Sequence, residues 1–570
     1  MGSLPPFVPF FLGALLVPFV RGVPRTLLLL LIPVVGGLNL AGLEMGQVLS
    51  ADLLGYALMP LRVDRLSMLF GILFHIAAFI GLVYALHLKR EDHDTVQHVS
   101  AVLYAGSALG AVFAGDLITL FVFWELLALT SVFLIWTRRK DSAVASGMRY
   151  LIIQVLSGVT LLAGIIVYAH DTGSIAFDFI GAESLGGKLI LLGIGVKAAF
   201  PLLHTWLTES YPEGTATGTV FLSAFTTKVA VYTLARGFPG TESLVWIGAV
   251  MACYPIFFAV IENDLRKVLS YSMMNQIGFM VVGVGLGTSL SINGAVAHAF
   301  NDVLFKGLLF MSMGAVLHVT GTTKASELGG LWKTMPITTA LCIVGALSIS
   351  AVPLFNGFVS KAMIMTALLE EHQNVIWLVM LFASAGVVEH AGIKIPFFAF
   401  FAHDSGIRAK EPPVNMLAAM GIGAALCIVI GWFPGLLYAR LPFAVDYTPY
   451  DVTHILTQTQ LLLFAVGAVV ALKFAGMYPP EIPSTNLDAE WFYRKLGPMV
   501  IRSVGGAVGA VDRSIRTVAV GSVRGVLRRS FRTHGPTGPL ARTWPSGSML
   551  LWVAILLSAI LAFYYVGPPT

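Results

Sequence analysis

Charged residues are scarce in this chain of 570 residues. Asp, Glu, Lys and Arg together make up 11% of the sequence, whereas a soluble domain carries about 25%. So few charges exclude a soluble enzyme, a disordered chain and a nucleic-acid-binding protein. The formal net charge of +5 is therefore no sign of DNA or RNA binding, because the excess Lys and Arg of a membrane protein usually lies in its cytoplasmic loops.

Cysteines and cofactor motifs are also few or missing. Cys253, Cys342 and Cys427 lie in apolar runs, without short spacing to one another and without a nearby histidine cluster. This pattern favours buried thiols over a disulfide or a metal site. Because there is no Fe–S, flavin or nucleotide motif and no catalytic triad, we predict a chain with no cofactor, no bound metal and no enzymatic activity of its own.

Long apolar stretches fill most of the sequence, and hydrophobic residues make up 57% of it. A membrane helix needs about 20 mainly apolar residues, and because lipid offers the backbone no hydrogen-bond partner, such stretches form helices. The first stretch has no basic residue before it and a second one follows at once, so both are predicted as mature spans rather than a signal peptide. About sixteen stretches qualify or nearly qualify, beginning near Pro6, Thr26, Val63, Val99, Leu117, Gly147, Gly187, Gly214, Ser243, Leu265, Ser291, Met335, Asn374, Asn415, Thr459 and Ser548.

Lys and Arg are distributed unevenly between the loops. The odd-numbered loops, which include Lys89, Arg90 and Arg266, hold thirteen of them, and the even-numbered loops hold five. Since basic loops stay in the cytoplasm, this bias predicts cytoplasmic odd-numbered loops in a multi-pass protein of the cell inner membrane. Both termini are then predicted on the outer side.

Residues 478–547 are too polar to span a membrane. They hold ten Lys or Arg and four Asp or Glu, and apolar residues recur at helical spacing from Val504 to Val518. The pattern predicts a basic amphipathic helix along the cytoplasmic face. A solvated linker is the alternative, because Gly505, Gly506 and Gly509 weaken a helix. A final span is predicted over 548–570.

Several ionisable residues lie inside the apolar stretches. A charge within a span costs at least about 2.5–3.5 kcal/mol and needs a reason. Burial in a low-dielectric site favours the neutral amine of a lysine and a nearby carboxylate favours its charged form, so such a set can pass protons along. The alternative is ion pairs that only hold helices together, but the lysines outnumber the nearby acids. The candidate relay consists of Glu125, Lys197, Lys228, His298, Asp302, Lys306, Lys361, Glu389 and Lys394.

Helix breaks are predicted beside two of these lysines. Pro201 follows Lys197, and Pro353 with Gly357 precedes Lys361. Broken helices at matching places in two halves indicate a transport site. The spacing from Lys197 to Lys361 is almost the same as the spacing from Lys228 to Lys394. It predicts an internal repeat of about 165 residues, with five spans in each half.

The stretches that carry these residues resemble a known family. DLITLFVFWELLALTS, KAAFPLLHTWL, SAFTTKVAVYTLAR, ENDLRKVLSYSMMNQIGFM and VPLFNGFVSK, within residues 60–440, are similar to the antiporter-like subunits of complex I, membrane-bound hydrogenases and Mrp-type cation/proton antiporters. SAFTTKVAVY, without a histidine before the lysine, looks closest to the Mrp D subunit. This chain has Asp302 where family members often carry a second histidine.

The resemblance implies an all-α polytopic membrane protein with about fourteen core helices in two inverted five-helix repeats. It implies an ion pair of Glu125 with Lys197 in the first half-channel, Lys228 as the next relay lysine, His298 and Lys306 as the central link, and Lys361 in the second half-channel. The tail loosely resembles the lateral helix and last span of the longest complex I-like subunit. The expected organisation is an N-terminal region (1–95), two repeats (96–240 and 241–402), core helices (403–477), a lateral segment (478–547) and a final span (548–570).

Three functions remain open at this point. The first is a proton-translocating subunit of a multisubunit antiporter, with other membrane subunits as partners and Na⁺ as the exchanged cation. The second is a membrane-arm subunit of a redox-driven proton pump, and the third is the membrane partner of an inorganic-carbon uptake complex. The resemblance favours the first, and the other two remain as alternatives.

Overall fold

The structure is a computed structural model that describes residues 4–53, 55–88, 92–479, 481–483 and 486–566. Lys89 and Arg90, which entered the topology prediction, lie outside these residues, as do the outermost residues of the predicted first and last segments. The chain forms two compact units, Met1–Asn486 and Leu487–Thr570, and each is described by itself.

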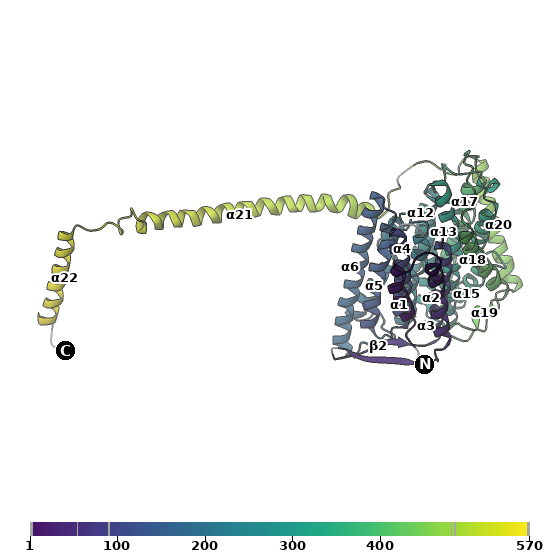
Figure 1. Ribbon diagram of the computed structural model, residues 1–570, viewed down its shortest axis with the longest axis horizontal. Coiled ribbons are helices and arrows are strands. Elements are labelled where there is room, and N and C mark those ends of the chain that lie inside the picture. The colour runs from purple at the N-terminus through teal and green to yellow at the C-terminus, as the bar shows by residue number, and fades with distance from the viewer. Residues whose placement is uncertain (1–3, 54, 89–91, 480, 484–485, 567–570) are drawn as a thin grey trace. The chain divides into compact units, whose positions relative to one another are not determined.

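The first unit is a bundle of helices that stand side by side (Figure 1). Short turns of 3-10 helix occur at Val17–Phe19 and Leu331–Lys333, and π-helical segments at Val388–Ile393 and Phe397–Phe401. The α-helices are α1 (Val8–Leu16), α2 (Val23–Ala41), α3 (Arg65–Ala85), α4 (Asp92–Phe113), α5 (Leu117–Trp136), α6 (Asp141–Thr172), α7 (Leu185–Lys197), α8 (Thr205–Ser210), α9 (Gly218–Ala224), α10 (Thr226–Gly237), α11 (Glu242–Ile261), α12 (Leu265–Leu286), α13 (Ser289–Thr320), α14 (Pro336–Ile349), α15 (Asn356–Glu370), α16 (Asn374–Val387), α17 (Lys394–Pro396), α18 (Val414–Trp432), α19 (Gly435–Tyr438) and α20 (Val452–Phe474).

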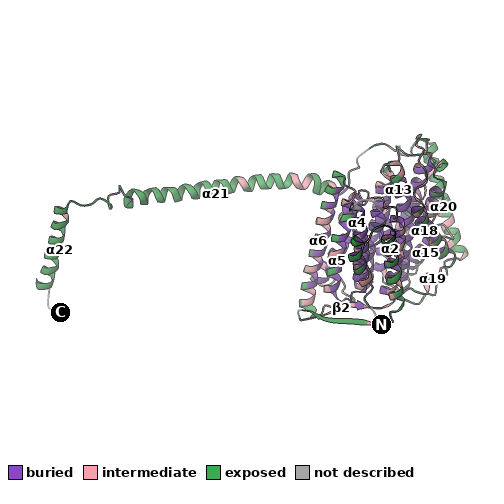
Figure 2. Ribbon diagram, in the orientation of Figure 1, coloured by how far each residue is buried: buried purple, intermediate pink, exposed green. Residues whose placement is uncertain are grey.

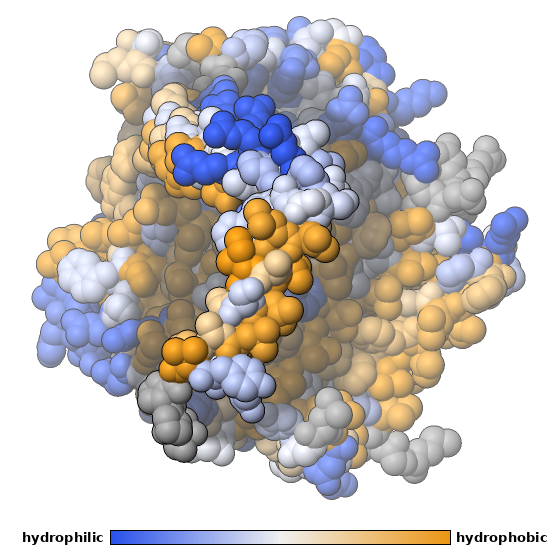
Figure 3. Space-filling model, turned by 90° about the vertical axis from the view of Figure 1, so that its left-hand side faces the viewer, coloured by the Kyte–Doolittle hydropathy of each residue, from blue (hydrophilic) through white to orange (hydrophobic). Residues whose placement is uncertain are grey.

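Thirteen helices among the described residues are long and apolar enough to cross a membrane, and Val8–Phe19 and Pro336–Ile349 are shorter apolar helices. Large apolar side chains are exposed around the bundle, and orange apolar residues lie on both sides of the view in Figure 3. Inner helices such as α13 are instead buried along nearly their whole length (Figure 2). The prediction of a polytopic helical membrane protein is therefore confirmed.

A β-hairpin departs from the predicted all-α fold. β1 (Val48–Leu53) pairs antiparallel with β2 (Tyr56–Arg62), with Leu53 opposite Tyr56. The hairpin is attached to the start of α5, because the Met59 N–H donates to Asp116 Oδ2 at 2.7 Å. Gly55, with a φ of 83°, lies in its turn, where glycine adopts a left-handed conformation without strain.

Two halves of the first unit share one backbone pattern. Asp116 caps α5 and pairs across an isolated β-bridge with Ala176, while Asp264 caps α12 and pairs in the same way with Lys324. The second set lies 148 residues after the first. Helices α6 and α13, each of 32 residues, follow at the same offset. The repeat is thus visible in the backbone, but it is shorter than the repeat predicted from the lysines.

The two helix breaks have the same geometry. Ala199 and Leu202 have φ values of 61° and 70° in the break between α7 and α8, and Ala351 and Leu354 have 55° and 76° between α14 and α15. Pro201 and Pro353 lie within these breaks, as predicted. Gly357 does not, because it lies inside α15, where its missing side chain lets the Ser348 carbonyl approach; a Cβ there would lie 1.8 Å from that oxygen.

The offset between the breaks is 152 residues, which corrects the predicted equivalence of Lys197 and Lys361. Lys197 ends α7 before the first break, whereas Lys361 lies in α15 after the second. The position equivalent to Lys197 is Ile349. Lys361 nevertheless reaches back to it, since its Nζ donates to the Ile349 carbonyl at 3.4 Å. The two lysines therefore approach the same place in each repeat from opposite sides of the break.

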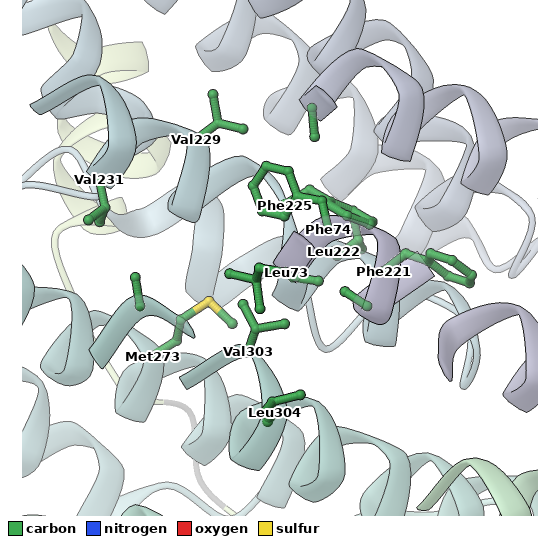
Figure 4. Close-up of a cluster of buried hydrophobic side chains, with 14 of the residues drawn as sticks. Leu73, Phe74, Phe221, Leu222, Phe225, Val229, Val231, Met273, Val303 and Leu304 are labelled. Carbon is green, nitrogen blue, oxygen red and sulfur yellow. The ribbon is translucent and has the colours of Figure 1, made fainter. Parts of the chain in front are cut away.

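A buried apolar cluster joins the two halves (Figure 4). Phe74 of α3 packs edge-on against Phe225, which lies between α9 and α10, with ring centroids 5.3 Å apart. Val303 of α13 and Met273 of α12 belong to the same fully or almost fully buried core. Because these side chains exclude water, polar groups beside them lie in a low-dielectric environment.

The second unit contains a π-helical turn (Phe492–Leu496), the long helix α21 (Gly497–His534) and the apolar helix α22 (Ser546–Val566). The predicted amphipathic helix is thus confirmed as a helix that continues through Gly505, Gly506 and Gly509. Its valines and arginines are exposed within the described residues (Figure 2). Its position on the cytoplasmic face stays a prediction.

Candidate functional site

The first candidate pair consists of Glu125 on α5 and Lys197 at the end of α7. Lys197 is completely buried, and its Nζ donates to the Trp124 carbonyl and lies 4.5 Å from the centroid of the Trp124 ring. Among the described residues, Glu125 Oε1 has no hydrogen-bond partner. The two side chains make no direct ion pair, but their charges interact electrostatically. Trp124, which was not singled out from the sequence, therefore holds the ammonium instead.

Gly158 on α6 makes room for the Glu125 carboxylate. A Cβ at position 158 would lie 1.3 Å from Glu125 Oε1, so no other residue fits there without moving the acid. The equivalent position in the second repeat, at the offset of α13 from α6, is Lys306. The same helical position thus leaves room for the Glu125 carboxylate in the first repeat and carries the Lys306 side chain in the second.

An ion pair joins the two repeats at the centre of the bundle. Lys228 Nζ on α10 lies 2.5 Å from Asp302 Oδ2 on α13, and both side chains are 0% exposed. Lys228 also donates to the Ser223 carbonyl at 3.3 Å. Asp302 lies between His298 and Lys306, the predicted central link, but its charged partner comes from the other half of the chain.

His298 and Lys306 extend this polar region along α13. Lys306 Nζ donates to Ser272 Oγ of α12 at 2.7 Å. The ring nitrogens of His298 lie 3.0 Å from Ser360 Oγ and 3.0 Å from Gln276 Oε1. Ser272, Gln276 and Ser360 were missed in the sequence because neutral polar residues are common in membrane helices.

Lys361 follows Ser360 on α15 and lies beside the second break. It is 2% exposed, and its Nζ lies 4.9 Å from the centroid of the Phe279 ring. Glu389, another residue of the candidate relay, accepts a hydrogen bond from the Tyr478 hydroxyl at 2.6 Å and does not contact Lys361. No carboxylate among the described residues forms an ion pair with Lys361.

Lys394 is buried inside the bundle rather than extended toward the lipid headgroups. Its side chain is 0% exposed and pairs with Glu481 Oε1 at 2.9 Å. Its Nζ also donates to the carbonyls of Val260 and Glu262 at 2.6 and 2.8 Å, where α11 ends. The ammonium thus satisfies carbonyls that a helix end leaves without partners, and it lies close to a fixed carboxylate.

We predict different effects for Lys361→Ala and Lys394→Ala. Lys361 has no fixed carboxylate partner among the described residues, so in the proton relay that the sequence predicts its replacement should stop proton transport while the protein still assembles. Lys394→Ala leaves Glu481 buried without its cation and should lower the yield of folded protein instead. Vesicle transport and detergent-extracted yield, measured at matched expression, test this difference; full yield of Lys394→Ala together with lost transport would contradict it.

Two further buried groups were missed in the sequence. Arg266 counted there only as a loop arginine, but its side chain is completely buried and donates to the Pro212 and Gly214 carbonyls at 2.8 and 3.0 Å. His390 lies in the π-helical segment Val388–Ile393, and neither of its ring nitrogens has a hydrogen-bond partner among the described residues. Segments of this kind are frequent at functional sites.

A metal centre is not found in the part of the chain that the structure describes, where no three His, Cys, Asp or Glu residues are placed to hold an ion. Cys253, Cys342 and Cys427 are free thiols, and the last two are buried. The candidate site is therefore a row of buried ionisable side chains that runs from α5 and α7 through α10 and α13 to α15.

Comparison with known proteins gives consistent matches. Residues 114–386 match the family described as NADH:quinone oxidoreductase/Mrp antiporter, TM. The A-type subunit of the Na⁺/H⁺ antiporter of Alkalihalophilus pseudofirmus is 30% identical over 423 residues, which cover 66% of this chain and 52% of that protein. The A/B-type subunit of a probable K⁺/H⁺ antiporter of Rhizobium meliloti is 32% identical over 402 residues, which cover 66% of this chain and 40% of that protein. The chain spans about half the length of the curated relatives it matches.

Two solved structures share the fold. A chain of the Mrp complex from Dietzia sp. superposes with a TM-score of 0.68 at 21% identity, covering 81% of this chain and 98% of that one. A chain of an archaeal membrane-bound sulfane sulfur reductase superposes with a TM-score of 0.68 at 21% identity, covering 82% of this chain and 97% of that one.

The relatives named above are A-type subunits, so the predicted closeness to a D subunit is not confirmed. Residues 114–386 of this multi-pass membrane protein are thus similar to the transmembrane region of the NADH:quinone oxidoreductase/Mrp antiporter family.

Proposed function

We propose that this chain is a proton-translocating membrane subunit of a multisubunit cation/proton antiporter with Na⁺ as the exchanged cation. The observation that supports this most is the row of buried lysines whose ammonium groups make no direct ion pair with an acid among the described residues. Lys197, Lys306 and Lys361 contact a backbone carbonyl, a serine hydroxyl and another carbonyl. Because a buried ammonium without a carboxylate is costly, such lysines are suited to release a proton and take it up again.

The direction of the relay follows from the repeat. Residues 96–240 would form the first half-channel, with Glu125 and Lys197, and residues 241–402 the second, with Lys361. Five spans in each half would invert the second against the first, so the two half-channels would open to opposite sides of the membrane. The Lys228–Asp302 pair, His298 and Lys306 lie between them and would carry the proton across.

The assembly and its place in the cell are part of the same proposal. The relatives are named as subunits of antiporters, which supports other membrane subunits as partners. SAFTTKVAVY, with no histidine before Lys228, supports a D-like proton path within the matched segment. We place the chain in the inner membrane with both termini on the outer side, as the distribution of basic residues predicts.

Glu125→Ala and Lys197→Ala test the proposal. Each variant is expected to abolish Na⁺-driven proton movement while the complex still assembles, because Glu125 Oε1 lacks a hydrogen-bond partner among the described residues and Trp124 holds Lys197 without a fixed carboxylate. The measurement is fluorescence-detected antiport in vesicles that contain the whole complex. Lys188→Ala is the matched control, since Lys188 is an exposed lysine on the same helix α7. Normal exchange in either site variant, at normal expression, would contradict the relay.

A further inference from the structure

A cavity of about 130 Å³ lies beside Lys361, between α15, α16 and α20. A cavity of about 10–15 Å³ already holds one water molecule when polar groups surround it. All three helices contribute polar lining groups here: Lys361 and Thr366 from α15, Ser384 from α16, and His454 and Gln458 from α20. The cavity is therefore large enough for several waters, and polar groups from all three helices reach it, while the rest of its lining is apolar.

Ser384 gives an independent sign of water in this cavity. Its side chain is 2% exposed, yet its Oγ has no hydrogen-bond partner among the described residues. Buried polar atoms nearly always have a partner in the protein or in ordered water. The ammonium of Lys361 is also weakly hydrogen-bonded, because its hydrogen bond to the Ile349 carbonyl is long at 3.4 Å. Water in the cavity would satisfy both groups.

Helix α20 connects the cavity to the break and to the protein surface. Gln458 Nε2 donates to the Ser350 carbonyl in the break at 3.1 Å. About one turn earlier, His454 Nε2 lies 2.9 Å from Thr366 Oγ1, and His454 Nδ1 lies in close contact with Asp451 Oδ2. The Asp451 side chain is 43% exposed. Polar groups thus follow one another from the buried Lys361 to an exposed carboxylate.

Other titratable groups lie near His454. Asp451 lies at the start of its own helix, and Lys361 lines the same cavity. The Tyr447 ring lies 5.8 Å away, and burial raises the pKa of Tyr447 to about 12, so this phenol keeps its proton at neutral pH. Thr366 carries no titratable group. Histidine changes its charge near neutral pH more readily than any other unperturbed side chain.

We propose that this cavity is a water-filled proton passage between Lys361 and the His454–Asp451 pair, with His454 as its outermost proton-transfer residue. The passage rests on the proposed function and adds to it the route by which the second half-channel reaches water. By the predicted topology, the loops next to Glu370 and Asp451 face the outer side, so the passage opens there.

Thiol labelling tests whether the cavity holds water, without any transport assay. Ser384→Cys in the assembled complex is expected to react with a membrane-impermeant methanethiosulfonate added from the outer side. The reaction should be at least about tenfold faster than that of Ser312→Cys, because reaction needs a hydrated thiolate. Ser312 is an equally buried serine whose Oγ donates to the Leu308 carbonyl, and the wild type corrects for the native cysteines. Equal rates, or reaction of Ser384→Cys only with a lipid-soluble maleimide, would overturn the passage.

Transport by His454→Gln tests the proton-transfer role. The amide can still bond to Thr366, but it cannot titrate, so proton movement should fall by about 100-fold, as for loss of a general acid–base group. Added imidazole should restore part of the rate, which a purely structural role of His454 would not allow. An unchanged rate would overturn the role of His454. If the wild-type complex moves no protons at all, the proposed function fails, while labelling of Ser384→Cys still decides whether the cavity is hydrated.

Discussion

Replacing Asp302 with asparagine is expected to abolish proton translocation and to lower the free energy of unfolding by about 3–5 kcal/mol, because removal of one partner leaves the other charge buried and unpaired. The remaining partner would be Lys228, whose side chain is 0% exposed. Buried apolar side chains such as Val303 lie beside the pair, so water cannot replace the lost carboxylate. Lys228→Ala should have a similar effect with the charges reversed. The loss of stability is measured by unfolding the purified complex in detergent. The loss of proton translocation is measured by antiport in vesicles.

A double variant separates stability from transport. Lys228→Met with Asp302→Leu removes both charges and fills the space with apolar atoms, which is often neutral or stabilising for a buried pair. We therefore expect the double variant to regain the yield and thermal stability that each single variant loses, but not the transport. Recovery of transport along with stability would show that the pair only holds α10 against α13 and carries no protons.

Arg266→Ala is expected to have the second large effect, this time on folding. The Arg266 guanidinium donates to the carbonyls of Pro212, Gly214 and Thr215, and also to Thr219 Oγ1. Most of these groups lie in the turn between α8 and α9, where the broken helix of the first repeat continues. Hydrogen bonds from a charged group contribute about 1.5–3 kcal/mol each, and their carbonyls would be left buried without partners. The loss should therefore exceed about 3 kcal/mol.

The melting temperature and yield of the detergent-solubilised protein measure this effect. Arg266→Lys should recover only part of the loss, since an ammonium cannot reach the same set of carbonyls as a planar guanidinium. Arg408→Ala is the control, because Arg408 forms an exposed pair with Asp404 and its removal should leave both measurements unchanged. A stable, well-expressed Arg266→Ala protein would mean that Arg138, which also donates to Pro212 at 2.6 Å, holds the turn by itself.

The helices could be predicted because a membrane span needs a long apolar run and leaves the backbone no alternative. The hairpin could not, since β1 and β2 are short, contain polar residues, and resemble a loop between two apolar stretches. The repeat was placed with the wrong offset because the lysines, rather than the backbone, were aligned. The better signal was in the sequence: Ala199 and Ala351 each stand two residues before a proline that a leucine follows.

The ionisable residues of the candidate site could be found one by one, because a charge in an apolar run stands out. Their partners could not, because partners meet only through packing. Lys228 and Asp302 lie in different halves of the chain and come together only when α10 packs against α13. The partner of Lys394 could not be predicted for the same reason, since Glu481 lies in a polar segment beyond the last core helix and returns to pair with this lysine. Charge positions are local information, whereas charge pairing depends on the whole fold.

The β-hairpin also indicates where the hydrocarbon layer of the membrane ends along the bundle. Its first strand is exposed along its whole length, and an open sheet edge exposes unpaired backbone groups that hydrocarbon does not tolerate. The hairpin must therefore lie in water or in the headgroup layer. Because Met59 is bonded to Asp116, the start of α5 lies at that same depth. One boundary of the hydrocarbon layer thus passes close to Asp116, and Glu125, more than two helical turns further along α5, lies well below it.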